Sequence, residues 1–243
     1  MHDFEHSETA EAGGISDPIA LARPDAKSIR NDVSRALAED IGSGDVTADL
    51  LPQSRQATAR VITREAAVLC GQPWFDQCFM ALDASVRINW LADEGSAVRP
   101  GQPLCDVSGP VRALVTAERS ALNFLQTLSA TATVTAAYVN AIRGTRACIL
   151  DTRKTLPGLR FAQKYAVRTG GGKNHRMGLH DAILIKENHI AAAGSLGAAV
   201  ARARQLHPQV MVEVEVENFS ELREALEAGV DRIMLDEFEL DEL

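Results

Sequence analysis

Four apolar runs of strand length follow one another in the second half of the chain, and helical patterns separate them. The runs are ACILDT (147–152), DAILIKE (181–187), VMVEVEVE (210–217) and DRIMLDE (231–237). GLRFAQKYAV follows the first run, SLGAAVARARQL the second and FSELREALEAG the third, where Asn218 is the expected N-cap and Gly229 the expected stop. Strands that alternate with helices form βα units around a parallel sheet. A complete eight-unit barrel needs about 250 residues, so this segment predicts an incomplete, open α/β barrel of four parallel strands.

Polar side chains stand at the carboxyl end of each of these predicted strands. They are, in chain order, Thr152, Arg153, Lys154, Lys186, Glu215 and Asp236. This edge of a parallel sheet faces the ligand crevice. One charge in an apolar strand is more often a structural ion-pair partner, but charges at four successive strand ends favour a binding site. Glu213, Glu215 and Glu217 share one strand face, so the pattern leaves open which of them reaches a ligand.

Positive charge is concentrated in residues 151–176, DTRKTLPGLRFAQKYAVRTGGGKNHR. This stretch has seven Lys or Arg residues and His175 against one acid, Asp151, although the whole chain has a formal net charge of −8. An acidic chain with no dominant basic face is not expected to bind nucleic acid. Concentrated positive charge in an acidic protein indicates a small polyanionic ligand instead.

Two details of this basic stretch have more than one interpretation. TGGGKNHR (169–176) predicts either a helix C-cap with a flexible loop, or a nest of backbone N–H groups for an anion beside Lys173, His175 and Arg176. Arg160 and Lys164 stand four residues apart on one predicted helix, which is typical of a solvated face.

The first half of the chain has a different pattern, which predicts an α+β domain over residues 24–130, before a barrel domain over 131–243. A helix is expected at 27–40, a strand at 56–63, a helix at 73–82 and short strands across 86–115. Residues 120–142 carry no charge and are numerous enough to span a bilayer. Their Asn, Gln, Ser and Thr content favours a buried helix instead, so no membrane association is expected.

The ends of the argument from composition concern the N-terminus and the cysteines. Residues 1–23 have acids where a signal peptide has basic residues, and a mobile tail is expected there. Four separate cysteines, Cys70, Cys78, Cys105 and Cys148, form no C-x-x-C pair. They are interpreted as buried thiols of a protein in the reducing cytoplasm.

Several segments together resemble the quinolinate phosphoribosyltransferase family. They are EDIGSGDVT (39–47), TAERSALNFLQTLSATATVT (116–135), DTRKTLPGLR (151–160), KYAVRTGGGKNHRMGLHDAILIKENHI (164–190) and VEVEVENFSELREALEAGVDRIMLDEF (212–238). The resemblance runs from about residue 24 to the end, and DTRKT-LPG with GGG-x-NHR is its most specific part. It implies an N-terminal α/β domain, an incomplete barrel, and a homodimer or larger assembly with shared active sites. The implied reaction joins quinolinate to 5-phosphoribosyl 1-pyrophosphate with Mg²⁺, giving nicotinate mononucleotide, carbon dioxide and pyrophosphate for NAD synthesis.

The resemblance also implies roles for individual residues. Quinolinate carboxylates are expected to meet Thr152, Arg153, His175, Arg176 and Lys186, together with Arg119 of the other subunit. Lys154 is expected to contact the phosphoribosyl substrate. Glu215 and Asp236 are expected to hold the ribose hydroxyls or the metal. Lys154, Glu215 and Asp236 are therefore the catalytic candidates.

One departure from the family bears on activity. The family pattern continues beyond DEFELDEL with two further strands and phosphate-binding loops, so the C-terminal part of the fold is expected to be missing from this sequence. Two alternatives follow: a related phosphoribosyltransferase with a different acceptor, or a truncated, non-catalytic dimer that binds anions.

Overall fold

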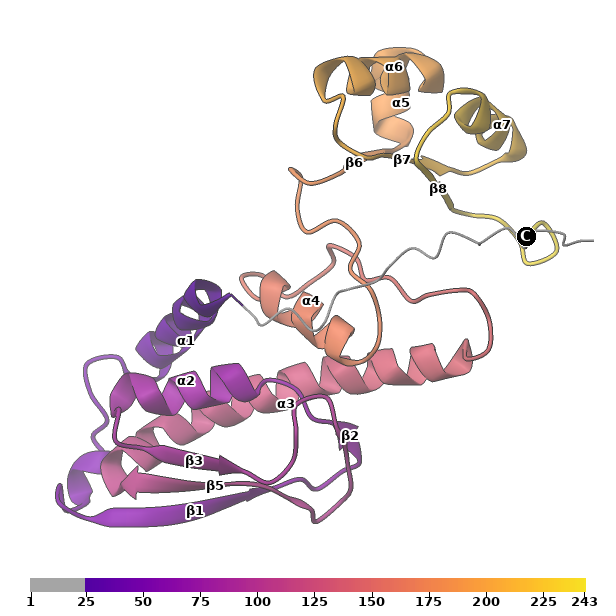
Figure 1. Cartoon of the computed structure of the whole chain (residues 1–243). Coiled ribbons are helices and arrows are strands. Elements are labelled where there is room, and N and C mark those ends of the chain that lie inside the picture. The colour runs from indigo at the N-terminus through magenta and orange to yellow at the C-terminus, as the bar shows by residue number, and fades with distance from the viewer. Residues whose placement is uncertain (1–24) are drawn as a thin grey trace, which may run out of the picture.

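The computed structural model describes residues 25–243, so the tail predicted for residues 1–23 lies outside the described residues. The first half of the chain combines helices with an antiparallel sheet of strand order β1-β5-β3, beside a small pair formed by β2 and β4 (Figure 1). Its elements are α1 (Ala26–Ile41), η1 (Ala48–Leu50), β1 (Gln56–Ile62), β2 (Ala67–Val68), α2 (Gln72–Leu82), β3 (Arg87–Trp90), β4 (Ala97–Val98), β5 (Pro103–Pro110) and α3 (Val111–Ala141). Both helices and the strand predicted before residue 83 are confirmed.

Local chemistry accounts for where these elements begin and end. The Asp25 side chain caps α1 by accepting the Ser28 N–H at 2.9 Å, and α1 ends at Gly42, whose φ is 55°. The strands predicted across 86–115 stop at Pro110, and residues 111–115 are helical. This part of the prediction was wrong because Pro110, which has no N–H to donate to a ladder, ends β5 and directly precedes α3.

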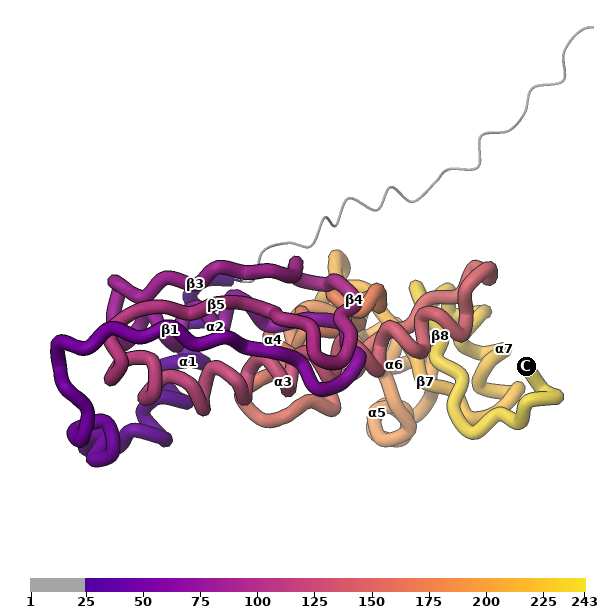
Figure 2. The backbone as a smooth tube through the Cα atoms, turned by 90° about the horizontal axis from the view of Figure 1, so that it is seen from below, coloured from indigo at the N-terminus to yellow at the C-terminus, as the bar shows by residue number. Residues whose placement is uncertain are grey.

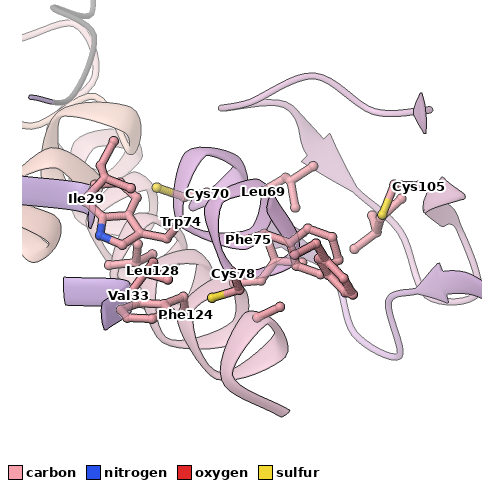
Figure 3. Packing of buried hydrophobic residues seen from close by; sticks show 14 of the residues in the cluster. Ile29, Val33, Leu69, Cys70, Trp74, Phe75, Cys78, Cys105, Phe124 and Leu128 are labelled. Carbon is pink, nitrogen blue, oxygen red and sulfur yellow. The ribbon is translucent and has the colours of Figure 1, made fainter. Parts of the chain in front are cut away.

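The first hydrophobic core lies between α2, α3 and the sheet. Trp74, Phe75 and Leu128 are fully buried there, and Figure 3 shows their side chains converging. The long helix α3 buries Ala117, Ala121 and Ala132 among its core residues, and these small side chains let neighbouring helices approach closely. No helix of the described part of the chain is long and apolar enough to cross a membrane.

The second half contains a parallel sheet with its own core. The strands β6 (Ile183–Ile185), β7 (Val212–Val216) and β8 (Arg232–Leu235) pair in sequence order, and Figure 1 shows α5 (Glu187–Ala193), α6 (Leu196–Leu206) and α7 (Phe219–Glu227) together on one side of them. Val212, Val214 and Val216 are fully buried in the second core. The two sheets lie toward opposite ends of an elongated molecule (Figure 2).

The first predicted parallel strand is not formed. Of the ACILDT run, only Leu150 makes a bridge, to Lys173, and two backbone hydrogen bonds join this run to Lys173. The run has a single neighbouring segment, so its apolar residues are not organised into a strand, and Cys148 is exposed. The other three cysteines are buried as predicted. A further difference is α5, which the sequence pattern did not indicate.

Helix α4 (Arg160–Thr169) connects the two halves. Its Ala162, Tyr165 and Ala166 belong to the first core, where α4 packs on α3. The loop before it carries Thr152, Arg153 and Lys154, and the loop after it carries His175 and Arg176. Helix α4 therefore holds two candidate loops against the first half of the protein.

Candidate active site

The ends of β6 and β7 bring together a lysine and a glutamate. The Nζ atom of Lys186, directly after β6, lies 2.6 and 2.5 Å from the two carboxylate oxygens of Glu215. Glu215 is buried in β7, whereas Lys186 is half-exposed. Asp236 follows β8 at the same edge, and its backbone N–H donates to the Val216 carbonyl at 2.9 Å. The three strand-end residues therefore lie on one edge of the sheet, as the parallel register requires.

Asp151 organises the loop that follows α4. It accepts hydrogen bonds from the Lys164 ammonium, from Asn174 Nδ2 and from the His175 backbone N–H, the last at 2.8 Å. Lys164 Nζ also donates to the His175 carbonyl at 3.0 Å. The prediction of a solvated face for Lys164 was wrong, because its side chain is 1% exposed and is neutralised by Asp151. This ion pair fixes the backbone of residues 174–175.

The ring of His175 is held from the opposite side. Its Nε2 lies 2.6 Å from Glu213 Oε2, and both side chains are buried, at 7% and 2% exposure. Arg232 Nη1 lies 3.5 Å from the same glutamate oxygen. Of the three alternating glutamates on β7, Glu213 thus contacts the histidine and Glu215 contacts the lysine, while Glu217 is exposed.

Two arginines lie close to each other beside this histidine. Burial lowers the pKa of the Arg176 guanidinium, the positive charge of Arg153 lowers it further, and Glu213 and Asp181 act in the opposite direction. The Nε atom of Arg153 is buried and has no hydrogen-bond partner among the described residues. Arg176 Nη1 donates to the Ala182 carbonyl at 3.4 Å. Like charges in proximity are unfavourable, so this arrangement favours the binding of an anion.

The loop before α4 is supported by Arg160. Its guanidinium donates to Thr155 Oγ1 at 3.2 Å and lies 3.5 Å from the carbonyls of Arg153 and Met177. Arg160 is therefore a half-buried structural link, and the solvated-face prediction was wrong for it as well. Thr152 Oγ1 accepts the backbone N–H of Lys154 at 3.0 Å, and both side chains are exposed.

The three adjacent glycines serve packing and helix termination. Their N–H groups donate to carbonyls of α4, those of Ala166, Arg168 and Val167, so they are not free to form an anion nest. A Cβ added to Gly170 would lie 2.4 Å from the Ala132 carbonyl oxygen on α3, and one on Gly172 would lie 2.8 Å from a Val167 methyl group. The helix-cap interpretation is confirmed, with Gly170 as C-cap of α4, and the nest interpretation is wrong.

Arg119 is the predicted site residue that the fold separates from the others. It is exposed on α3, sixteen residues before Thr135, which packs beside Gly170 and Gly172. At about 1.5 Å of rise per residue the two positions are about 24 Å apart along the helix. Two surface hollows of about 450 and 530 Å³ also lie elsewhere, and neither is lined by a predicted site residue.

Several residues of the site were not singled out by the sequence. They are Asp151, Lys164, Asn174, Glu213 and Arg232. Asp151 carried one usable signal, because it is the only acid in the basic stretch. In the following, the basic cluster means Arg153, Lys154, His175, Arg176 and Lys186.

Comparisons with known proteins connect this geometry to a family. The family model described as quinolinate phosphoribosyl transferase, C-terminal domain, matches residues 131–243, and that of the N-terminal domain matches residues 45–129. A Mycobacterium leprae protein named nicotinate-nucleotide pyrophosphorylase (carboxylating) is 43% identical over 216 residues, covering 86% of this chain and 75% of that protein. A Bacillus subtilis protein, a probable nicotinate-nucleotide pyrophosphorylase (carboxylating), is 41% identical over 199 residues, covering 82% and 69%. The solved structure of the Francisella tularensis nicotinate-nucleotide pyrophosphorylase has a TM-score of 0.87 and 46% identity, covering 90% of this chain and 78% of that chain.

Proposed function

The chain belongs to the quinolinate phosphoribosyltransferase family, and we propose that its basic cluster and strand-end acids carry out the reaction. The enzyme transfers the phosphoribosyl group of 5-phosphoribosyl 1-pyrophosphate to quinolinate with decarboxylation. The products are nicotinate mononucleotide, carbon dioxide and pyrophosphate, and the reaction serves NAD synthesis. What remains to be assigned is how the residues share this work.

The observation that carries the assignment is the closeness of Arg153 and Arg176. Quinolinate is a dicarboxylate, and a guanidinium presents donors in a fork that matches a carboxylate. The buried, unpartnered Nε of Arg153 supplies a donor that a bound carboxylate would satisfy. We assign both arginines to quinolinate, with His175 beside them and Thr152 nearby.

The co-substrate is assigned to the residues around the open sheet edge. Lys154 is exposed and has no ion-pair partner within the described residues, so its ammonium is available to a phosphate. Glu215 and Asp236 stand at the neighbouring ends of β7 and β8, where we place the ribose. In the absence of substrate Lys186 neutralises Glu215. We propose that Lys186 turns to a quinolinate carboxylate when substrate binds.

The chemistry follows from these charges. Departure of pyrophosphate gives the ribose an oxocarbenium-like character, as in glycosyl transfer, and the carboxylate of Glu215 stabilises that positive charge. The basic cluster neutralises the carboxylates of the acceptor and orients its ring nitrogen towards the anomeric carbon. Once alkylated, the ring nitrogen is cationic and accepts the electron pair that the departing carboxylate releases. This sequence requires no nucleophilic side chain.

Magnesium is assigned to the substrate phosphates and Asp236. The described residues contain no group of three or more acidic, His or Cys side chains that could hold a metal ion. Mg²⁺ is usually bound by one or two carboxylates together with substrate phosphates, and the exposed Asp236 fits that requirement. Glu215 fits it only after leaving Lys186. When bound, the ion would neutralise charge on the leaving pyrophosphate.

Arg119 is assigned to the active site of a second subunit. Its distance along α3 from the basic cluster of its own chain, about 24 Å, supports this, as does its exposure. We therefore propose a homodimer, or a larger assembly built from such dimers, in a cytoplasmic enzyme. We also propose that residues 24–130 and 131–243 are its two domains, with β6-β7-β8 as part of an open barrel.

The assignment of quinolinate is tested with the variants Arg153→Ala and Arg176→Ala. Each should weaken quinolinate binding by about 1.5–3 kcal/mol, the usual contribution of a hydrogen bond to a charged group, with a smaller effect on the phosphoribosyl substrate. Isothermal titration with each substrate measures this, and Arg30→Ala, an exposed arginine on α1, is the matched control. Unchanged quinolinate affinity in both variants would contradict the assignment. Binding by the parent chain without release of carbon dioxide would favour a non-catalytic protein, and turnover of another acceptor a related transferase.

A further inference from the structure

Glu213 is a buried carboxylate for which the reaction as described has no use. It lies in β7 between Val212 and Val214, both fully buried, and is itself 2% exposed. A carboxylate in such surroundings is costly unless it is hydrogen-bonded and neutralised. Its partners are His175 at 2.6 Å and Arg232 at 3.5 Å, the latter directly opposite it in the β7–β8 register.

The contact with Glu213 determines which ring nitrogen of His175 carries a proton. An ionised carboxylate only accepts hydrogen bonds, so Nε2 must be the donor. The backbone of the same residue is fixed by Asp151 and Lys164, at 2.8 and 3.0 Å. His175 is thus held at its main chain and at one ring nitrogen. No hydrogen bond of Nδ1 occurs within the described part of the chain, which leaves that atom for a ligand.

We propose that Glu213 is a positioning residue for quinolinate binding, acting through His175. It keeps the proton on Nε2 and holds the ring in one orientation, so that a further proton on Nδ1 can be donated to a substrate carboxylate. It also supplies the negative charge that lets an imidazolium exist beside Arg153 and Arg176. This inference rests on the proposed function, because it requires that His175 meets quinolinate.

The same geometry separates the roles of neighbouring glutamates on β7. Glu213 and Glu215 are two residues apart and face the same side of the strand, but one contacts a histidine and the other a lysine. Glu213 should therefore influence the acceptor dicarboxylate, and Glu215 the ribose. A substitution at Glu213 is expected to change the affinity for quinolinate, with little change for 5-phosphoribosyl 1-pyrophosphate.

The proposal is tested by a double-mutant cycle on full-length protein. The variants are Glu213→Gln, His175→Gln and the double variant, and Glu227→Gln, an exposed glutamate at the end of α7, is the control. Titration should show quinolinate binding about tenfold weaker in Glu213→Gln, as expected for loss of a hydrogen bond to a charged group. The double variant should bind no more weakly than His175→Gln alone. Additive losses, or equal losses for both substrates, would overturn the proposal.

A second readout does not depend on turnover or on substrate. In protein with ¹⁵N-labelled histidine, the signal of His175, identified by its absence in His175→Gln, should show a protonated Nε2. Glutamine can donate as well as accept, so in Glu213→Gln the proton should be distributed over both nitrogens. An unchanged signal would overturn the positioning role. If the parent protein makes no nicotinate mononucleotide while this signal shifts as expected, the proposed function fails and the positioning role stands. If Glu213→Gln does not fold, Glu213→Asp, which retains the charge but shortens its reach, serves in the same measurements.

Discussion

The buried ion pair between Asp151 and Lys164 is predicted to be the contact on which the loop of His175 and Arg176 most depends. The change that tests this is Lys164→Met, which retains an unbranched side chain of similar length and removes the charge. Lys164 is 1% exposed and Asp151 is 7% exposed, so water cannot replace the lost partner. Breaking a buried pair by removing one member costs about 3–5 kcal/mol.

The structure places the expected loss at the lower end of that range. Asp151 would keep two other donors, Asn174 Nδ2 and the His175 N–H. The hydrogen bond from Lys164 to the His175 carbonyl would be lost as well, which adds about 1 kcal/mol. We therefore expect the free energy of unfolding to fall by about 3–4 kcal/mol. In Asp151→Asn/Lys164→Met, with no uncompensated charge left, the loss should be smaller than in Lys164→Met alone.

Urea denaturation followed by tryptophan fluorescence is a suitable assay. The ring of Trp74 lies 5.5 Å from that of Tyr165, the neighbour of Lys164 on α4, so its emission is sensitive to this part of the fold. Lys27→Met, at an exposed position of α1, is the control for the loss of a lysine. A loss below about 1 kcal/mol for Lys164→Met, or a double variant less stable than Lys164→Met, would refute the reasoning. Quinolinate affinity should fall with the stability of the loop, and it provides the functional readout.

Three other outcomes are expected. Burial raises the pKa of Asp76 to about 6, with a contribution from Glu94 and against the hydrogen bond from Trp90, so stability present below about pH 4 should be lost as pH rises through about 6. Asp76→Asn should then raise the unfolding free energy at neutral pH by about 1–2 kcal/mol, discounted for its partial exposure, but not at pH 4, as melts at both pH values would show. Glu215→Gln and Asp236→Asn should lower kcat and kcat/KM together with near-normal melting temperatures, and a large drop in melting temperature with normal kcat would return both residues to a structural role. Mixing Arg119→Ala subunits with Lys154→Ala subunits should restore some activity, because one shared site per heterodimer is intact, and no recovery despite demonstrated subunit exchange would exclude a shared site.

How well the sequence predicted the fold depended on whether a pattern had one structural cause. The runs at 181–187, 210–217 and 231–237 formed β6, β7 and β8, since an apolar run between helical patterns is buried by helices on the sheet. ACILDT has the same composition, but strand formation also needs neighbours, and the run has only the segment around Lys173. Apolar character predicts burial, and it says nothing about the number of hydrogen-bonding partners.

The candidate site shows the same division between what is local and what is not. The strand-end residues Lys186, Glu215 and Asp236 were brought to one edge because parallel strands share their direction. Lys164 was misjudged because its spacing from Arg160 is also that of a solvated helix face. Its partner Asp151 lies thirteen residues earlier, outside any helical repeat. Glu213 and Glu215 differ only in which basic side chain reaches them, and that depends on the fold of two separate loops.

Helix α4 explains why a site for anions contains a buried acid and a buried lysine. The loop of His175 bridges to a single backbone segment, at Lys173 and Leu150, so a sheet cannot hold it on both sides. Side chains of α4 replace the missing strand: Lys164 holds the loop, while the adjacent Tyr165 donates to Glu94 of the first core at 3.0 Å. Because adjacent residues of a helix point in different directions, α4 can attach to the site and to the first core at once. Charges that bind substrate must be free to leave their partners, as Lys186 is from Glu215, whereas the charges that hold the loop are buried and fully paired.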